Sequence, residues 1–267
     1  MSSVNILPSK GGGKRDRSQQ EKQLNTYTIR RALGVALLTA LLATPSLIQA
    51  AEEPRNIDPF EPANRKIFAF NRAIDKVLFR PVAKGYNLIL PQPFRNGIGN
   101  FFNNLTYPVT IVNSFLQGKG KQGANDTARF LVNSTFGVLG LFDPATASGL
   151  EEHQEDFGLT FAHWGIQPGP YVVLPVFGPF TARSAIGIIP NIQVNPLVQM
   201  NNTSVRDKLL ITWFIESRAA LIGPDEVIED AYDPYLFLRD AYLQNRRYLL
   251  EGPSEDEDFF DEEFDEF

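Results

Sequence analysis

The stretch DFGLTFAHWGIQPGPYVVLPVFGPFTARS, residues 156–184, interrupts a chain that otherwise favours helices. It is apolar, yet it contains four glycines and four prolines: Gly158, Gly165, Gly169, Gly178, Pro168, Pro170, Pro175 and Pro179. Proline lacks the backbone N–H and glycine lowers helix stability, so this spacing excludes one long helix. The segment is also too apolar for a disordered connection. We therefore expect a long irregular segment that lies against an apolar surface, either the protein's own core or lipid.

Helices are predicted on both sides of this segment, because apolar residues recur there at helical spacing. Asp58, followed by Pro59 and Glu61, forms a helix-start signal in which Asp58 is the capping residue. No segment alternates regularly between apolar and polar residues, so the two strand candidates are interpreted as extended loop. The prediction is an all-α fold. The strand candidates are 171–176 and 188–194, and the predicted helices cover about 58–79, 81–91, two pieces within 94–117, 125–136, a short piece within 151–164, 204–222 and 234–250.

Several of these helices are short, rich in phenylalanine and bounded by proline, a pattern that suits helices lying in a membrane interface. Ordinary core helices remain the alternative for each of them. No segment after residue 50 contains the roughly 18 consecutive apolar residues of a spanning helix. The prediction is therefore a single domain of short, partly interfacial helices with long Gly/Pro loops.

The N-terminal residues 1–50 are interpreted as a leader and a secretory signal peptide. A basic start is followed by an apolar run at 32–43, a breaker at Pro45 and small residues. Cleavage is expected near Ala50. The alternative is an uncleaved anchor, although the apolar run is shorter than the roughly 20 residues that span a bilayer.

The C-terminal residues 251–267 carry ten acidic residues and no basic ones. This charge density predicts a disordered, acidic, Phe-containing tail. The domain between the two ends, residues 51–250, is nearly neutral. It has no basic surplus with which to attract nucleic acid.

The sequence offers no recognisable catalytic or metal-binding set. It contains no cysteine and two histidines, His153 and His163, whose spacing fits no zinc motif. Residues 118–123, GKGKQG, lack the form of a phosphate-binding loop, and there is no GxSxG elbow. We therefore expect no enzymatic activity, no catalytic residues, no metal and no cofactor.

Taken in order, many short motifs resemble the MlaA/VacJ family of outer-membrane lipid-transport proteins. The resemblance extends over about residues 58–248. Its motifs include Asp58-Pro59-Phe60-Glu61, Phe70-Asn71, Arg80-Pro81-Val82-Ala83, Pro91-Gln92-Pro93, Phe115-Leu116-Gln117-Gly118, Phe157-Gly158, Gly169-Pro170-Tyr171 and Asp233-Pro234-Tyr235.

This resemblance implies a ring-like protein at the periplasmic face of the outer membrane that surrounds an amphipathic channel. Such a protein removes mislocalised phospholipids from the outer leaflet and passes them to a soluble periplasmic carrier of the MlaC type, which maintains lipid asymmetry. The expected partners are phospholipid, that carrier and a trimeric outer-membrane porin. The alternatives are a structural or adaptor protein that binds porins without moving lipid, and a periplasmic lipid-degrading enzyme.

The resemblance also suggests a hinge beside the channel. Gly165, Gly169 and Gly178 are the hinge residues that it implies. Gln167 stands where another glycine is expected, which would reduce the flexibility of this loop.

A helix segment that influences channel gating is the second implied site. Its residues are Phe68, Phe70 and Asn71, with core packing of the two phenylalanines as the alternative. Many family members are lipoproteins, whereas this chain has no cysteine to carry a lipid. We therefore expect a non-lipoprotein that binds the membrane through its own helices, through a porin or through an uncleaved N-terminal segment.

Overall fold

The structure is a computed structural model that describes residues 57–252. The predicted signal peptide and nearly all of the acidic tail lie outside these residues. The elements are α2 (Glu61–Ile74), the π-helix η1 (Asp75–Phe79), α3 (Arg80–Ile89), α4 (Gln92–Thr106), α5 (Pro108–Leu116), α6 (Gly120–Thr135), α7 (Pro144–Ala147), α8 (Phe157–His163), β1 (Tyr171–Leu174), β2 (Gly178–Thr181), α9 (Ala182–Val194), α10 (Thr203–Ala220), α11 (Pro224–Asp230) and α12 (Pro234–Glu251).

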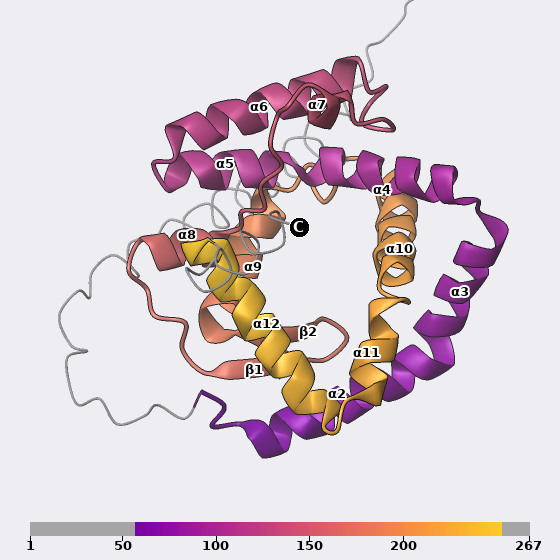
Figure 1. Ribbon diagram of the computed structural model, residues 1–267, viewed down its shortest axis with the longest axis vertical. Helices are drawn as coiled ribbons and strands as arrows, with labels where there is room; N and C mark the ends of the chain where they lie inside the picture. Colours follow the sequence, from indigo (N-terminus) through magenta and orange to yellow (C-terminus); the bar gives the residue numbers. More distant parts are fainter. Residues whose placement is uncertain (1–56, 253–267) are drawn as a thin grey trace, which may run out of the picture. The chain divides into compact units, whose positions relative to one another are not determined.

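The elements of the described domain form a closed circuit of contacts. α2 continues through η1 into α3, and both α3 and α4 contact α10. α4 contacts α5, which pairs with α6 and reaches α8, while α8 packs along α9 and α9 contacts β2. Because β1 pairs with β2 and contacts α2, the circuit returns to its start, with α12 crossing it (Figure 1). The prediction of a ring-like, mainly helical domain is confirmed.

The opening stretch of the sequence contains a β-hairpin. β1 and β2 pair in antiparallel register, from Tyr171 opposite Thr181 to Leu174 opposite Gly178. The interpretation of 171–176 as extended loop was therefore wrong. Strands of four residues are too short to show a sustained alternation, and their pairing depends on contacts from elsewhere in the chain.

Asn64 on α2 supplies one of these distant contacts. Its Nδ2 donates to the carbonyl of Tyr171 at 3.1 Å, and its Oδ1 accepts from the N–H of Val173 at 2.9 Å. The side chain thus bonds the β1 edge that faces away from β2. With 3% of its surface exposed, Asn64 has little access to water that could replace these bonds.

The second strand candidate, 188–194, is helical and belongs to α9. The helix runs through Pro190 for one further turn before it ends at Val194. Proline has no backbone N–H, so Pro190 removes one hydrogen bond from α9. Pro190 lies one turn before the end of the helix, where the loss of one bond does not end it. The interpretation of 188–194 as extended loop was therefore wrong.

Asp58 does not cap α2 as the sequence suggested. The helix begins at Glu61, and its N-cap residue, Phe60, makes no side-chain capping bond. Asp58 is instead 3% exposed and accepts hydrogen bonds from Asn64 Nδ2 at 2.8 Å and from the hydroxyl of Tyr235. The carboxylate therefore ties the start of α2 to α12.

The hydrophobic core beside the hairpin is small. Tyr171, Val173 and Tyr235 form its buried centre. The ring centroids of Tyr171 and Tyr235 lie 6.3 Å apart in an edge-to-face arrangement, which is favourable for aromatic pairs. The partly buried side chains packed around this centre come from α2 and α12: Ile67, Phe68, Leu236, Tyr242 and Leu243.

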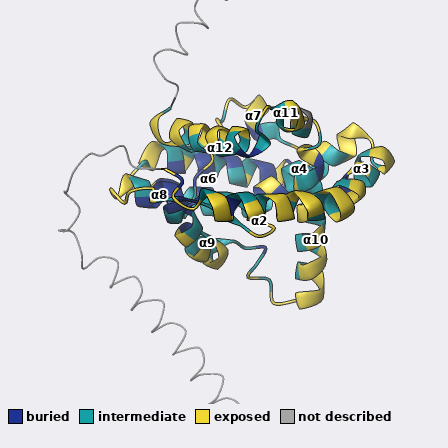
Figure 2. Ribbon diagram, turned by 90° about the horizontal axis from the view of Figure 1, so that it is seen from below, coloured by how far each residue is buried: buried dark blue, intermediate teal, exposed yellow. Residues whose placement is uncertain are grey.

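Polar and apolar residues are distributed unusually in this domain. Among residues 57–252, fifteen polar or charged residues are buried against eleven hydrophobic ones. Large hydrophobic side chains are meanwhile exposed on most helices, including Val77 at 81%, Leu88 at 87% and Ile89 at 77%. Figure 2 colours the ribbon by burial and shows exposed residues on the helices, α3 and α10 among them. Within the same residues, no helix has the length and apolar character needed to cross a membrane.

Candidate functional site

A pocket of about 640 Å³ lies where α3, α4, α7 and α10 meet. This volume falls within the range of small-molecule sites. Figure 1 shows α10 on the inner side of the bend between α3 and α4. The lining is rich in polar side chains and consists of Tyr86, Asn87, Gln92, Arg95, Asn96, Gly99, Asn100, Asp143, Thr146, Ala147, Glu216, Ala219 and Ala220.

Arg95 supplies the positive charge of this pocket. Its Nη1 donates to Asn87 Oδ1 at 2.6 Å, and its Nη2 donates to Gln92 Oε1. Asn87 in turn donates to the carbonyl of Ala219 at 3.1 Å, which links α3 to α10. Two neutral amides thus fix the guanidinium, and no carboxylate of the described residues forms an ion pair with it.

Glu216 on α10 supplies a negative charge to the same pocket. No described residue hydrogen-bonds to its carboxylate, and burial raises its pKa above the ordinary value. A Cβ added at Gly99 would lie 2.9 Å from Glu216 Oε1, so the carboxylate sits close against α4. Burial also raises the pKa of Tyr86, which senses both Glu216 and Arg95. The three side chains therefore form one electrostatic group.

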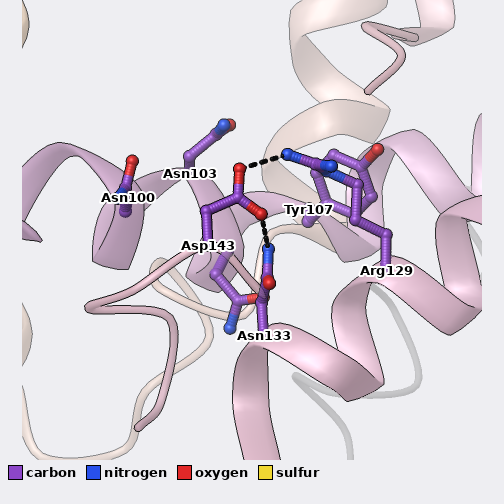
Figure 3. A pocket seen from close by; sticks show the side chains of 7 residues that line it. Asn100, Asn103, Tyr107, Arg129, Asn133 and Asp143 are labelled. Atoms are coloured by element: carbon purple, nitrogen blue, oxygen red, sulfur yellow. Dashed lines mark hydrogen bonds and ion pairs between the residues drawn. The ribbon is translucent and has the colours of Figure 1, made fainter. Parts of the chain in front are cut away.

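A smaller pocket adjoins the first and shares Asn100 and Asp143 with it (Figure 3). Its free volume is about 10 Å³, roughly the room that one water molecule needs. Arg129 Nη2 lies 2.6 Å from Asp143 Oδ2, and Asn133 Nδ2 donates to Asp143 Oδ1 at 2.9 Å. Burial acts to raise the pKa of Asp143, but these partners and Thr146 lower it overall. This carboxylate is thus committed to structure.

The sequence analysis overlooked these pocket residues, although α4 contains a signal for them. Gln92, Asn96, Asn100 and Asn103 recur every three or four positions, which places them along one side of a helix. The sequence analysis instead used the apolar residues of this helix, which predicted its secondary structure. A stripe of amides opposite an apolar face is a recognisable sign of a polar lining.

The predicted gating residues have three different environments. Phe68 packs on the core, with its ring centroid 5.6 Å from that of Tyr235, whereas Phe70 is 51% exposed. Asn71 Nδ2 donates to the carbonyl of Leu174 at 2.9 Å, and its Oδ1 accepts from the N–H of Val176 at 2.8 Å. Asn71 thus fixes the end of β1 and the hairpin turn. The structure shows these contacts, and the gating role stays a prediction.

The predicted hinge residue Gly165 ends α8. It has φ +85°, its N–H donates to the carbonyl of Ala162, and the N–H of Ile166 donates to the carbonyl of Phe161. This is the Schellman pattern, in which the residue after the C-cap adopts the left-handed conformation that glycine accepts without strain. A structural requirement for glycine therefore exists at this position, independent of any motion.

The other two predicted hinge residues lie beside the hairpin. Gly169, with φ +66°, comes so close to α9 that an added Cβ would be 3.0 Å from the Cβ of Ala182. Gly178, with φ +88°, is the first residue of β2. Arg183 Nη1 donates to the carbonyl of Ile166 at 2.7 Å, which pins the loop between α8 and β1. The hinge role of these glycines stays a prediction.

The predicted residues and the pockets occupy different parts of the domain. None of the three glycines or of the gating residues lines either pocket. Gly169, Gly178 and Asn71 lie at the hairpin and Gly165 lies at the end of α8, while the pockets lie among α3, α4, α6, α7 and α10. Among residues 57–252 there is also no cluster of His, Cys, Asp and Glu that could hold a metal ion.

Comparison with known proteins identifies the family. A family model described as MlaA lipoprotein matches residues 56–249. The Escherichia coli K12 protein named intermembrane phospholipid transport system lipoprotein MlaA is 34% identical over 227 residues, which cover 83% of this chain and 87% of that protein. An uncharacterised Rickettsia prowazekii protein is 36% identical over 198 residues, which cover 73% of this chain and 79% of that protein.

A solved structure agrees with these relatives. It comes from work on the structural basis for maintenance of bacterial outer-membrane lipid asymmetry. Its chain is 34% identical to this one, and the two superpose with a TM-score of 0.65 over 73% of this chain and 99% of that chain. The sequence match and the matching fold together show that this chain belongs to the MlaA lipoprotein family.

Proposed function

We propose that this protein is the outer-membrane component of a phospholipid transport system. It removes mislocalised phospholipids from the outer leaflet through an amphipathic channel and passes them to a soluble periplasmic carrier of the MlaC type. Lipid asymmetry of the outer membrane is thereby maintained. The names of the E. coli and Haemophilus influenzae relatives, which place them in an intermembrane phospholipid transport system, support this proposal.

The inverted distribution of side chains is the observation that carries the proposal. A water-soluble domain buries its large apolar residues, and its fully buried positions are mostly hydrophobic. Here buried polar residues outnumber buried hydrophobic ones within residues 57–252, while Leu88, Phe136 and Phe177 are 87%, 78% and 74% exposed. Such a domain suits surroundings of lipid chains, with polar groups held inside.

Lipid extraction has a cost that explains this arrangement. Moving one chain methylene from lipid into water costs roughly 0.8 kcal/mol of free energy, so a phospholipid with about thirty methylenes would need about 24 kcal/mol to leave the membrane unshielded. A transport protein must therefore shield the chains while it offers the headgroup a polar route. Exposed apolar helices beside a polar-lined pocket supply both surfaces.

Membrane association follows from the same surface. The named relatives are lipoproteins, whereas the present sequence contains no cysteine to which a lipid could be attached. We propose that the exposed apolar side chains of the described domain hold it at the periplasmic face of the outer membrane. Leu139 and Phe142, 67% and 65% exposed in the loop before α7, are two of these side chains.

The proposed role involves two protein partners and no catalysis. A trimeric porin is the expected neighbour in the membrane, and the soluble carrier is the expected acceptor of lipid. We propose a passive conduit rather than an enzyme, because the described pockets hold amides, an arginine and carboxylates without an arranged nucleophile and base.

Deletion of the gene tests the proposal. Ethanolamine headgroups on the surface of intact cells are labelled with a membrane-impermeant amine reagent, and the labelled phospholipid is quantified. We expect more labelled phospholipid in the deletion strain and a return to the wild-type amount on complementation. An unchanged amount in the deletion strain would show that the proposal is wrong.

The adaptor hypothesis predicts a different result. Gly169→Phe adds bulk where even a Cβ approaches Ala182, whereas Gly120→Phe adds the same bulk at an exposed position with no neighbour within 4 Å of an added Cβ. A conduit that depends on this loop fails to complement with Gly169→Phe, complements with Gly120→Phe, and retains porin in pull-down with both. An adaptor that does not move lipid predicts full complementation by both variants, and full complementation by Gly169→Phe would contradict a conduit that depends on this loop.

A further inference from the structure

The pocket among α3, α4, α7 and α10 contains one cation and one anion that are not paired with each other. Arg95 contacts only neutral amides, and Glu216 has no hydrogen-bond or ion-pair partner among the described residues. Both side chains line the same volume of about 640 Å³. Elsewhere in the domain, arginines such as Arg218 and Arg246 form close ion pairs with carboxylates. Within the described domain, Arg95 and Glu216 thus lack ion pairs of the kind that Arg218 and Arg246 form.

The pocket wall also contains two buried polar atoms that form no hydrogen bond within residues 57–252. Arg95 Nε and the hydroxyl of Tyr86 are buried without a partner among the described residues. Both atoms are enclosed by their neighbours, so they mark polar strain in the wall rather than open contacts. Buried polar groups are normally satisfied, so this part of the pocket wall departs from the usual pattern of a protein interior. The raised pKa of Glu216 indicates in addition that its charged form lacks compensation.

These groups limit the chemistry of a ligand. A simple anion would compensate Arg95 but would be repelled by Glu216, and a simple cation would have the opposite difficulty. A zwitterion with a phosphate at one end and an ammonium at the other satisfies both. A primary ammonium donates hydrogen bonds to a carboxylate, whereas a quaternary ammonium has no N–H to donate.

We propose that this pocket binds the headgroup of a phospholipid that ends in a primary ammonium, with Arg95 contacting the phosphate and Glu216 the ammonium. The amides of Gln92, Asn96 and Asn100 add neutral donors and acceptors along the same wall. The acyl chains stay outside this polar volume. This inference rests on the proposed function, because the lipid source of the headgroup follows from it.

Lipid binding from defined vesicles tests the inference. The purified full chain is incubated with vesicles that contain equal amounts of phosphatidylethanolamine and phosphatidylglycerol, and is then reisolated. Bound phospholipids are quantified by headgroup with mass spectrometry. We expect wild-type protein to favour phosphatidylethanolamine about tenfold, since one hydrogen bond to a charged group gives that discrimination.

Two variants separate the roles of the charges. Glu216→Gln should bring the headgroup ratio close to that of the vesicles while total bound lipid persists. Arg95→Gln should lower binding of both headgroups alike, because both contain the phosphate. The matched controls are Glu251→Gln and Arg247→Gln, which change exposed residues outside the pocket. Unchanged circular dichroism confirms that each variant is folded.

Other outcomes would overturn the inference. Bound lipid whose headgroup ratio equals that of the vesicles, in wild type and in Glu216→Gln, would disprove headgroup recognition while leaving lipid transport intact. Wild-type protein that binds no lipid at all would contradict the proposed function itself. A third arm uses soluble glycerophosphoethanolamine. If this compound binds wild type but not Glu216→Gln, and no lipid enrichment occurs, the pocket serves a free solute and the lipid source is wrong.

Discussion

Asn64→Ala should strongly destabilise the domain, because this one amide bonds two backbone groups of β1. Without it, the carbonyl of Tyr171 and the N–H of Val173 each lose a partner, and Asp58 loses one of its hydrogen bonds. Leaving a buried polar group unsatisfied costs about 1–3 kcal/mol. Two backbone groups together predict a loss of about 4 kcal/mol, a large part of the roughly 5–15 kcal/mol that stabilises a typical domain.

Asn71→Ala is the matched control for this change. Asn71 also bonds one carbonyl and one N–H of the hairpin, at 2.9 and 2.8 Å, but its acceptor and donor lie near the exposed turn. Water can replace the lost bonds there, so the expected cost is about 1 kcal/mol. The two variants therefore remove the same chemistry in a buried and in an accessible setting.

Urea unfolding in mild detergent, followed by circular dichroism, measures both effects. Asn64→Ala should unfold at a much lower urea concentration than Asn71→Ala, with the same slope if the transition stays two-state. Hydrogen exchange at the amide of Val173 should accelerate in Asn64→Ala alone. Equal losses of stability in the two variants would refute the claim that burial of the Asn64 bonds stabilises the hairpin.

Three further predictions concern Gly165 at the end of α8, Phe68 in the core and Glu216 in the pocket. Gly165→Ala should lower the free energy of unfolding by about 1 kcal/mol, since alanine is strained in the left-handed conformation. Gly165→Asn should fold normally. Loss of lipid transport in the asparagine variant would reveal a hinge, and normal transport would leave only the structural role. Phe68→Ala should lower the free energy of unfolding, measured by chemical denaturation, by about 2 kcal/mol. The exposed Phe70→Ala should lower it by less than about 0.5 kcal/mol. Equal losses in the two variants would place Phe68 outside the core. Because Glu216 has a raised pKa in the folded state, the free energy of unfolding that it contributes is highest below its ordinary value of 4.5 and falls as the pH rises through the raised pKa. Glu216→Gln should therefore be more stable than wild type at pH 7 but not at pH 4, and parallel pH–stability curves would contradict this reasoning.

The sequence predicted the helices well where amphipathic periodicity is long. α4, α5, α10 and α12 lie close to their expected positions, because each combines an apolar stripe with a proline, glycine or capping signal at its ends. α9 was missed, because 188–194 was interpreted as extended loop although the helix runs through Pro190 to Val194.

The hairpin and the role of Asp58 could not be predicted in the same way. The strands have four residues each, and β1 is bonded by Asn64, which is 107 positions away from Tyr171 in the sequence. Local propensity contains no information about such a contact. Asp58 likewise had the signature of a helix cap, but its burial against Tyr235 of α12 determined its role.

The pocket was only partly visible in the sequence. The amide stripe of α4 could have indicated a polar lining, because it follows helical spacing. Glu216 could not have been assigned to it, since its approach to Gly99 depends on how α10 packs against α4.

Transfer of lipid between defined compartments tests the central claim most directly. The full chain is reconstituted into vesicles that contain a radiolabelled phospholipid, and a soluble carrier of the MlaC type is added and then separated for counting. We predict that labelled lipid reaches the carrier faster from vesicles with the protein than from protein-free vesicles, and that Arg95→Gln slows this transfer while Arg247→Gln does not. Equal transfer from vesicles with and without the protein would contradict its role in phospholipid transport.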